Sequence, residues 1–266
     1  SRVQSLVDIK QWMRTFAVEH IVGNWDSYGY GNGQNMYAYK PTDGKWQLMI
    51  WDLDIGNGSG ESARTPPFKL TNPFFPEVNG DTEIVRTMFQ TPAFERAYWR
   101  AILDAVNGPM QEDRVDQFLT TRFEKLRTAI GGNRPTSPRS ISRYTQQRRD
   151  YLLGLLDRHE IEFRITSGPN GDTTVTTDQS PIIVTGSAPF NVFSIRVNGI
   201  LHQPKWTDTT EWELAIPLKR EQSLMTFDGV DSFGNSIDQT TPSLTVVFTG
   251  ASSQLLPDLV FNEWMA

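Results

Sequence analysis

Apolar residues recur at helical spacing along most of the first 160 residues. One segment covers residues 3–22, others lie between residues 82 and 130, and a last one runs from residue 141 to residue 155. Intervals of three or four residues place apolar side chains on one face of an amphipathic helix. We therefore predict a mainly helical first part, and we expect its apolar stripes to pack in a core.

Two short apolar runs interrupt this pattern. MYAY (36–39) and KWQLMIW (45–51) flank PTDG, whose proline, aspartate and glycine favour a turn. Apolar and aromatic runs joined by a turn are typical of a β-hairpin. The sequence thus predicts a small hairpin within the helical part.

The pattern changes near residue 167. A segment rich in turn residues (166–181) precedes five short β-like runs, which are IIVTG, FSIRVNG, WELAIPL, LMTFDGVD and LTVVFTG. Short strands at such intervals are typical of a β-sandwich. We predict an α+β chain in which residues 1–165 form the helical domain and residues 168–250 an all-β sandwich. Residues 251–266 are predicted to be a linker and the start of a further domain.

Composition excludes several classes of protein. The 266 residues carry a formal net charge of −6 and include no cysteine. The negative charge disfavours binding to nucleic acid, and the lack of cysteine excludes disulfides and thiolate metal sites. No apolar run reaches the roughly 20 residues that span a bilayer. Because Ser1 lies at the start of a predicted helix, we expect the chain to be a piece of a longer protein.

Polar residues gather where the predicted hairpin begins and ends. Asp26 and Asn35 precede its first strand, and Asp52 and Asp54 follow its second. The outer ends of two antiparallel strands lie side by side, so these side chains are expected to converge. Carboxylate and amide oxygens suit Mg²⁺. A catalytic Asp, a metal-binding Asn, a hairpin and a metal-binding Asp follow one another in the same order in protein kinases.

The same stretch resembles a known family. Asn-x-Asp (24–26), Asn-x-Tyr-x-Tyr (35–39) and Trp-Asp-Leu-Asp (51–54) followed by glycine are similar to the signature of the CotH kinase family. These are atypical, secreted or spore-coat protein kinases related to spore coat protein H. The similarity continues through TMFQTPAFERAYWRAI and YTQQRRDYLLGLL. It covers roughly residues 3–160, which correspond to the C-terminal half of such a kinase, with a kinase-like C-terminal lobe.

This resemblance implies roles for the residues around the hairpin. Asp26 would be the catalytic base, Asn35 and Asp52 would bind metal, and Asp54 would be a second ligand or a structural cap. Trp51 would flank the nucleotide, although a lone tryptophan at a strand end more often packs in a core. The cofactors would be Mg²⁺ and ATP, and the γ-phosphoryl would pass to a Ser/Thr hydroxyl of a protein substrate.

The sequence also departs from that of a complete kinase. SYGYGNGQ, between the predicted base and the predicted metal-binding asparagine, is longer than the four-residue gap of typical kinases. Its glycines either allow close approach of the backbone to a ligand or mark a flexible insertion. The lysine that anchors the nucleotide is expected upstream of Ser1, so we expect the parent protein to be active and the isolated chain to be inactive.

The β-rich part has resemblances of its own. VTGSAP, SIRVNG, TTEWELAIPL and DGVDSFGN are similar to repeats of bacterial Ig-like domains in large exported proteins. The terminal VFNEWMA resembles the first strand of a lamin-tail-type domain. Together they imply a multidomain protein that is secreted or displayed on the bacterial surface.

Two other functions stay open from the sequence alone. A degenerate kinase fold could serve as a non-catalytic surface or adhesion module, in which Asp52 and Asp54 hold structural Ca²⁺. Glu19 together with these aspartates or Asp26 could instead supply the acid pair of a glycosidase.

Basic residues of the first part offer weaker candidates. Arg143, Arg148 and Arg149 could bind phosphate, although a solvated helix face is the favoured interpretation. His20 could orient the loop that follows it, although a lone histidine at a helix end is more often a surface or core residue.

Overall fold

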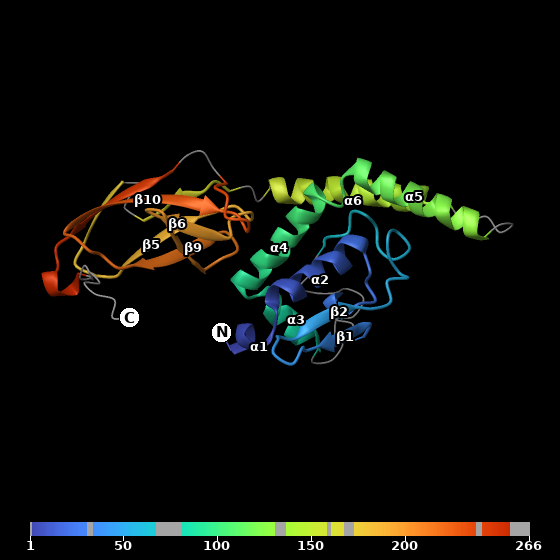
Figure 1. Cartoon of the computed structure of the whole chain (residues 1–266), viewed down its shortest axis with the longest axis horizontal. Coiled ribbons are helices and arrows are strands. Elements are labelled where there is room, and N and C mark those ends of the chain that lie inside the picture. The colour runs from blue at the N-terminus through green and yellow to red at the C-terminus, as the bar shows by residue number, and fades with distance from the viewer. Residues whose placement is uncertain are drawn as a thin grey trace, which may run out of the picture. The chain divides into compact units, whose positions relative to one another are not determined.

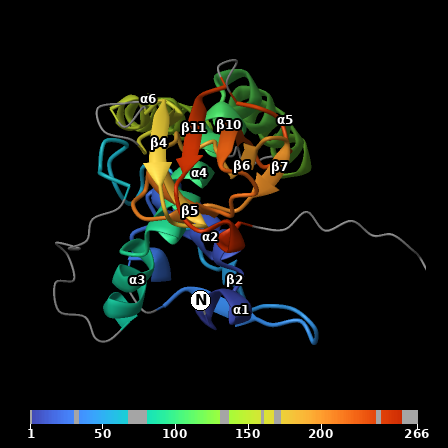
Figure 2. The ribbon, with the colours of Figure 1, turned by 90° about the vertical axis from the view of Figure 1, so that its left-hand side faces the viewer.

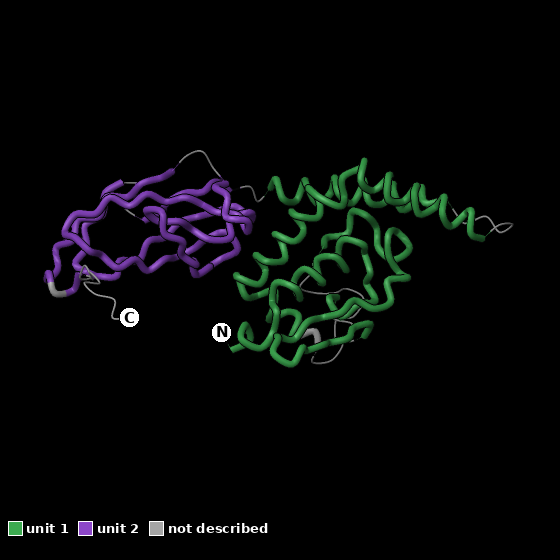
Figure 3. The backbone as a smooth tube through the Cα atoms, viewed as in Figure 1, with its two compact units in different colours: residues 1–160 green, residues 161–266 purple. Residues whose placement is uncertain are grey.

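The computed structural model describes residues 2–30, 34–67, 81–130, 137–158, 161–167, 173–237 and 241–255. The chain divides into two compact units, residues 1–160 and 161–266 (Figure 3). This division lies earlier than the predicted boundary near residue 167, because Arg164–Ile165 pairs with a strand of the second unit. Residues 256–266, where we predict the start of a further domain, lie outside the described residues.

The first unit is mainly helical and contains one small hairpin, as predicted (Figure 1). Its elements are α1 (Arg2–Leu6), α2 (Ile9–Val22), the 3-10 turn η1 (Tyr28–Tyr30), β1 (Met36–Tyr39), β2 (Gln47–Ile50), α3 (Asp81–Phe89), α4 (Pro92–Asn107), α5 (Glu112–Ile130) and α6 (Arg139–Asp157). None of the helices in the described ranges is long and apolar enough to cross a membrane.

The helix predicted over residues 3–22 is broken into α1 and α2. Asp8 ends the first and caps the second, because its carboxylate accepts a hydrogen bond from the Gln11 N–H at 3.2 Å. An aspartate at this position satisfies one of the N–H groups that a helix start leaves free. At the break, Val7 forms a parallel bridge with Trp46, which joins the helical segment to the hairpin.

Helix α2 lies at the centre of the first unit and packs against α4, β2 and η1. Its buried face carries Met13, Phe16 and Ala17, and α4 contributes Tyr98 and other fully buried side chains. Aromatic rings connect the layers: Phe16 stacks on Phe89 of α3 at 6.0 Å, and Phe89 meets Tyr98 edge-on at 4.9 Å. This core holds α2 in place, and the end of α2 in turn holds the candidate site.

The apolar stripe of α5 does not lie in a core. None of the described residues of α5 is buried, and Phe118 is 60% exposed, so the expectation of core packing is wrong for this helix. Its packing partner is α6, where Ser142 donates a hydrogen bond to Asp116. The start of α6 thus lies beside the first half of α5, yet apolar side chains of α5 such as Phe118 remain exposed.

The second unit is an all-β sandwich of two sheets, as predicted. One sheet has the order β4-β11-β10-β6-β7, which Figure 2 shows side by side, and the other has the order β3-β5-β9-β8. Their bounds are β3 (Arg164–Ile165), β4 (Thr174–Thr177), β5 (Ile182–Ser187), β6 (Ser194–Val197), β7 (Ile200–His202), β8 (Lys205–Trp206), β9 (Glu211–Ile216), β10 (Gln222–Val230) and β11 (Ser243–Phe248).

Alternating side chains of the two sheets fill the sandwich core. Strand β5 alternates buried and less buried positions, and Val184 on it is fully buried. Trp212 of β9 stacks on Phe163 at 6.2 Å and lies 6.4 Å from the ring of Phe227 on β10. The five predicted runs correspond to β5, β6, β9, β10 and β11. The short strands β3, β4, β7 and β8 were not predicted, because two to four residues give too short a pattern.

Phe227→Ala should destabilise the sandwich by about 3–5 kcal/mol, because the substitution empties a fully buried aromatic position. The matched control is Phe233→Ala, since Phe233 is 88% exposed and its loss should cost less than about 0.5 kcal/mol. Urea unfolding followed by circular dichroism measures both. Equal stabilities of the two variants would contradict this description of the core.

Candidate functional site

The candidate site is built on the C-terminal end of α2. Gly23 follows the helix in the left-handed conformation, with φ 71°, and its N–H bonds the Glu19 carbonyl. The Asn24 N–H bonds the same carbonyl at 3.0 Å. A glycine in this conformation ends a helix without steric cost and turns the chain sharply. The turn carries the chain into the segment 23–30, which contains Asp26.

The last carbonyl groups of α2 are bonded by residues far away in the sequence. The His20 carbonyl accepts a hydrogen bond from the Arg148 guanidinium at 2.6 Å, and the Ile21 carbonyl accepts one from the Tyr144 hydroxyl at 3.1 Å. The Val22 carbonyl accepts the N–H of Asn57 at 2.7 Å. The four carbonyl groups at a helix end need such donors. Here the donors come from α6 and from the loop after β2.

Arg148 is buried and serves as a structural clamp. Besides the His20 carbonyl, its guanidinium bonds the carbonyls of Ala63, at 3.1 Å, and Thr65. It is fully enclosed, so neither the phosphate-binding interpretation nor the favoured solvated helix face holds for this arginine. A cation beside the negative end of a helix dipole is stabilised further. The sequence did contain a signal of this burial, because Arg148 falls on the apolar stripe of its helix, between Tyr144 and Leu152.

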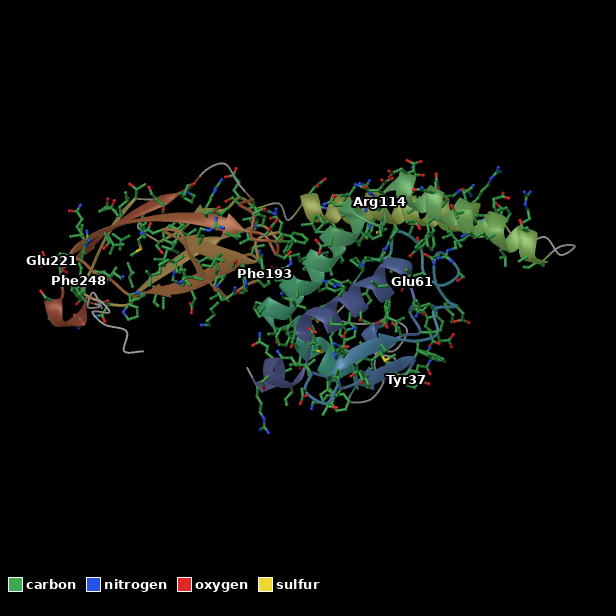
Figure 4. The ribbon with its side chains drawn as sticks, in the orientation of Figure 1. Tyr37, Glu61, Arg114, Phe193, Glu221 and Phe248 are labelled. Atoms are coloured by element: carbon green, nitrogen blue, oxygen red, sulfur yellow. The ribbon has the colours of Figure 1, made fainter. Side chains whose placement is uncertain are left out.

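The same loop is fastened at a second point. The Tyr30 hydroxyl donates to the Glu61 carboxylate at 3.0 Å, and the Glu61 N–H bonds the Gly23 carbonyl at 3.4 Å. Figure 4 labels Glu61 in this loop. Segments 23–30 and 57–65 are therefore tied both to each other and to the end of α2.

Two buried titratable side chains of α2 lie against the segment 23–30. Burial raises the pKa of Glu19 to about 7, while the hydrogen bond from the Gly29 N–H opposes that rise. Burial lowers the pKa of His20 to about 3 and keeps its ring neutral. Its Nδ1 lies 2.8 Å from the Tyr98 hydroxyl and its Nε2 3.0 Å from the Gly29 carbonyl. His20 is thus a core residue, and Glu19 is enclosed by protein, which argues against a glycosidase acid.

Asp26 and Asn35 lie together, which is one part of the convergence expected of Asp26, Asn35, Asp52 and Asp54. The Asn35 amide nitrogen donates to the Asp26 carboxylate at 3.0 Å and to the Asp26 carbonyl at 2.7 Å. The Gln34 amide also donates to this carboxylate. Asn35 has a φ of 56°, in the left-handed region that asparagine tolerates better than most residues. Its amide oxygen accepts no hydrogen bond from the described part of the chain.

The backbone of Asp52 is joined to Asn24, two residues before Asp26. The Asn24 amide nitrogen donates to the Asp52 carbonyl at 3.4 Å, and Asp52 has a φ of 56°. Because Met36 pairs with Ile50 at the end of the hairpin, Gln34 and Asp52 lie two positions beyond the last pair. The Asp52 side chain is exposed. The described residues place its backbone beside the segment that carries Asp26.

Asp54 and Trp51 are also exposed. Trp51 is 56% exposed and meets Tyr37 of β1 edge-on at 5.2 Å. Core packing, the commoner role of a lone tryptophan, is therefore not its role here. The Asp54 carbonyl accepts a hydrogen bond from the Ser59 hydroxyl at 3.4 Å, and its carboxylate has no partner in the described ranges. Both residues follow β2 in the chain, and Trp51 lies against Tyr37, which Figure 4 labels on the hairpin.

The donor atoms near Asp26 fit a hard cation in part. Asp26, Asn35 and Asp52 supply carboxylate and amide oxygens, the ligands that Mg²⁺ prefers. The buried Asn24 amide oxygen has no hydrogen-bond partner, so this end of α2 holds one unsatisfied acceptor. Among the described residues no three His, Cys, Asp or Glu side chains come together in a metal-binding cluster. A metal would thus be held by mixed carboxylate and amide ligands.

Arg148→Met should destabilise the first unit by about 3 kcal/mol or more, because it leaves two buried carbonyl groups and one part-buried carbonyl group without their donor. Arg143→Met, at an exposed position of the same helix, is the control and should change stability by less than about 0.5 kcal/mol. Urea unfolding of both variants decides the matter. A loss for Arg148→Met no larger than that of the control would refute the clamp.

Glu19 and His20 should make stability depend on pH in opposite directions. The pKa of Glu19 is raised from 4.5 to about 7 on folding, so its contribution is present below 4.5 and is lost as the pH rises through 7. The pKa of His20 is lowered from 6.5 to about 3, so its contribution is lost as the pH falls from 6.5 toward 3. Between pH 4.5 and pH 6.5 the two contributions oppose each other, and from pH 6.5 to about pH 7 only Glu19 of the two still titrates, so stability should fall there and then level off.

Glu19→Gln should abolish this fall, and because the opposing contribution of Glu19 is gone, stability should then rise with pH between 4.5 and 6.5. Urea midpoints measured from pH 4 to pH 8.5 for the unsubstituted chain and for Glu19→Gln test whether Glu19 causes the fall. Parallel profiles above pH 6.5 would show that another group is responsible.

Two similar solved structures are fibronectin(III)-like modules of Clostridium thermocellum CbhA and Bacteroides ovatus mixed-linkage glucan utilization locus SGBP-B in complex with a mixed-linkage heptasaccharide. The first has 12% identity and a TM-score of 0.24, and the match covers 34% of this chain and 99% of that one. The second has 21% identity and a TM-score of 0.22, with 29% and 22% covered.

No curated protein sequence matches the chain. The family described as CotH kinase protein matches residues 1–152, which include every predicted site residue. This match confirms the resemblance seen in the Asn-x-Asp and Trp-Asp-Leu-Asp motifs. Since it spans more than half of the sequence, the chain belongs to the CotH kinase protein family.

Proposed function

We propose that this chain carries the phosphoryl-transfer residues of an atypical protein kinase. The parent protein would transfer the γ-phosphoryl of ATP to a Ser/Thr hydroxyl of a protein. The observation that supports this most directly is the Asp26–Asn35 hydrogen bond at 3.0 Å, in a chain of the CotH kinase family. A carboxylate fastened beside a metal-binding amide is the arrangement that protein kinases use.

Asp26 would act as the base. Its carboxylate is oriented by the amide nitrogens of Asn35 and Gln34 and is only partly buried, so a substrate hydroxyl can reach it. It would accept the hydroxyl proton while the hydroxyl oxygen forms a bond to the γ-phosphorus. The bond between this phosphorus and the bridging oxygen breaks, and ADP leaves with the bonding electrons.

Asn35 and Asp52 would hold Mg²⁺, with Asp54 as a further ligand or a cap. Because Asn35 uses its amide nitrogen to hold Asp26, its amide oxygen is available for a cation. When bound, Mg²⁺ would neutralise the negative charge of the phosphates. Trp51 offers an exposed aromatic face beside Asp52, on which the nucleotide base could stack.

We further infer that the parent protein is exported and displayed on the cell surface. The support is the sandwich of residues 161–255, whose sequence resembles the Ig-like repeats of large exported proteins. Such repeats commonly extend or anchor a surface protein, and this unit supplies no predicted catalytic residue.

Asp26→Asn in the parent protein should lower kcat for phosphorylation by about 10²–10⁴-fold and leave ATP binding nearly unchanged, because it removes the base alone. Asp52→Asn should weaken binding of Mg²⁺-ATP by about tenfold or more, because it removes a metal ligand. Asp43→Asn, in the exposed hairpin turn, is the control for both. Calorimetry and transfer of labelled phosphate measure the effects.

Two results would overturn the proposal. Absence of Mg²⁺-ATP binding together with tight Ca²⁺ binding would favour the non-catalytic surface module. Full activity of Asp26→Asn would remove the base from its role.

A further inference from the structure

Gly29 is bonded from both sides by consecutive residues of α2. Its N–H donates to the Glu19 carboxylate at 3.1 Å, and its carbonyl lies 3.0 Å from His20 Nε2. Gly29, Glu19 and His20 are all buried. Both backbone polar groups of one residue are thus fixed by side chains, in a segment with little regular secondary structure of its own.

The hydrogen-bond roles of His20 follow from its partners. A carbonyl oxygen can only accept, so Nε2 must carry the proton that it donates to Gly29. The neutral ring then accepts at Nδ1, where the Tyr98 hydroxyl lies at 2.8 Å. Tyr98 is itself fully buried in α4. The ring is therefore held in one tautomer and one orientation by the core.

Gly29 has no room for a side chain. A Cβ atom there would lie 2.4 Å from the Glu19 carboxylate and 3.0 Å from the Phe16 ring. The close approach of the backbone to α2 explains why glycine occupies this position in SYGYGNGQ. Of the two interpretations of the glycines in this segment, the contact at Gly29 favours close approach of the backbone over a flexible insertion. Here the backbone approaches α2, however, and not a ligand.

We propose that Glu19 and His20 are positioning residues that, by fixing the backbone of Gly29, hold Asp26 in place for phosphoryl transfer. Gly29 is three residues beyond Asp26. Glu19 bonds its N–H and His20 its carbonyl, so these two residues hold the segment at both backbone polar groups of Gly29. This inference rests on the proposed kinase function. It adds residues that touch neither substrate nor metal but act through the loop.

The first test adds a methyl group at Gly29, where Glu19 and His20 bond the backbone. Gly29→Ala in the parent protein should lower kcat at least tenfold, with the KM for ATP changed less than twofold, because the added carbon displaces the loop. Glu19→Asp, which is shorter by one methylene, should restore part of that kcat when combined with Gly29→Ala. Gly154→Ala is the matched control, since a Cβ there meets no atom within 4 Å and activity should stay unchanged.

The second test removes the hydrogen bonds and keeps the volume. Glu19→Gln retains an acceptor for the Gly29 N–H and should keep most of kcat, whereas Glu19→Met should lose at least tenfold. His20→Gln can still donate from its amide nitrogen and should exceed His20→Leu in kcat. A purely structural role would lower thermal stability in step with activity, so equal kcat per folded molecule in all variants would overturn the proposal.

Hydrogen exchange separates this inference from the proposed function, because it needs no activity. In this chain the Gly29 amide should exchange at least a hundredfold more slowly than an exposed loop amide, and Glu19→Met should abolish most of that protection. An unprotected Gly29 amide would overturn the fixing of Gly29 even in an active kinase. Protection with no phosphoryl transfer in the parent would overturn the catalytic purpose, and with it the proposed function.

Discussion

The carbonyl groups at the end of α2 are the constraint on which the first unit depends. Once buried, they need donors, and the structure supplies them from Arg148, Tyr144 and Asn57. These donors lie far from α2 in the sequence. Satisfying one helix end therefore brings α6, the loop after β2 and the segment 23–30 into one place, and it sets the distance between the two loops that carry the predicted site.

The fold could be predicted where the hydrophobic pattern is local. The site could be predicted where the connection between its elements is as simple as a hairpin. The hairpin and the sandwich follow from short alternating runs and turn residues, and hairpin geometry places the backbone of Asp52 beside the residues before β1. Arg148 and Glu19 were not predicted as structural residues, because a charged side chain is buried only when tertiary partners exist for it. The prediction of core packing failed for α5 for the converse reason. Helical periodicity shows that one face of a helix is apolar, but it does not show which element packs against that face.

The site divides into a rigid inner part and an open outer part. Glu19, His20 and Arg148 are enclosed and bond backbone groups, whereas Asp52, Asp54 and Trp51 are exposed beyond β2. Asp26 and Asn35 lie between these layers and are partly buried. Such an arrangement holds functional groups by a fixed scaffold while leaving them accessible to a nucleotide and a second substrate.

The most direct measurement is hydrogen exchange of this chain, in which the unsubstituted chain is compared with the Arg148→Met variant at equal folded fraction. If the end of α2 holds the site together, protection should fall in segments 19–30 and 57–65 at once, while the sandwich core around Phe227 keeps its protection. A loss confined to α6 would contradict the account, because the two loops would then be held by contacts other than the bonded carbonyls of α2.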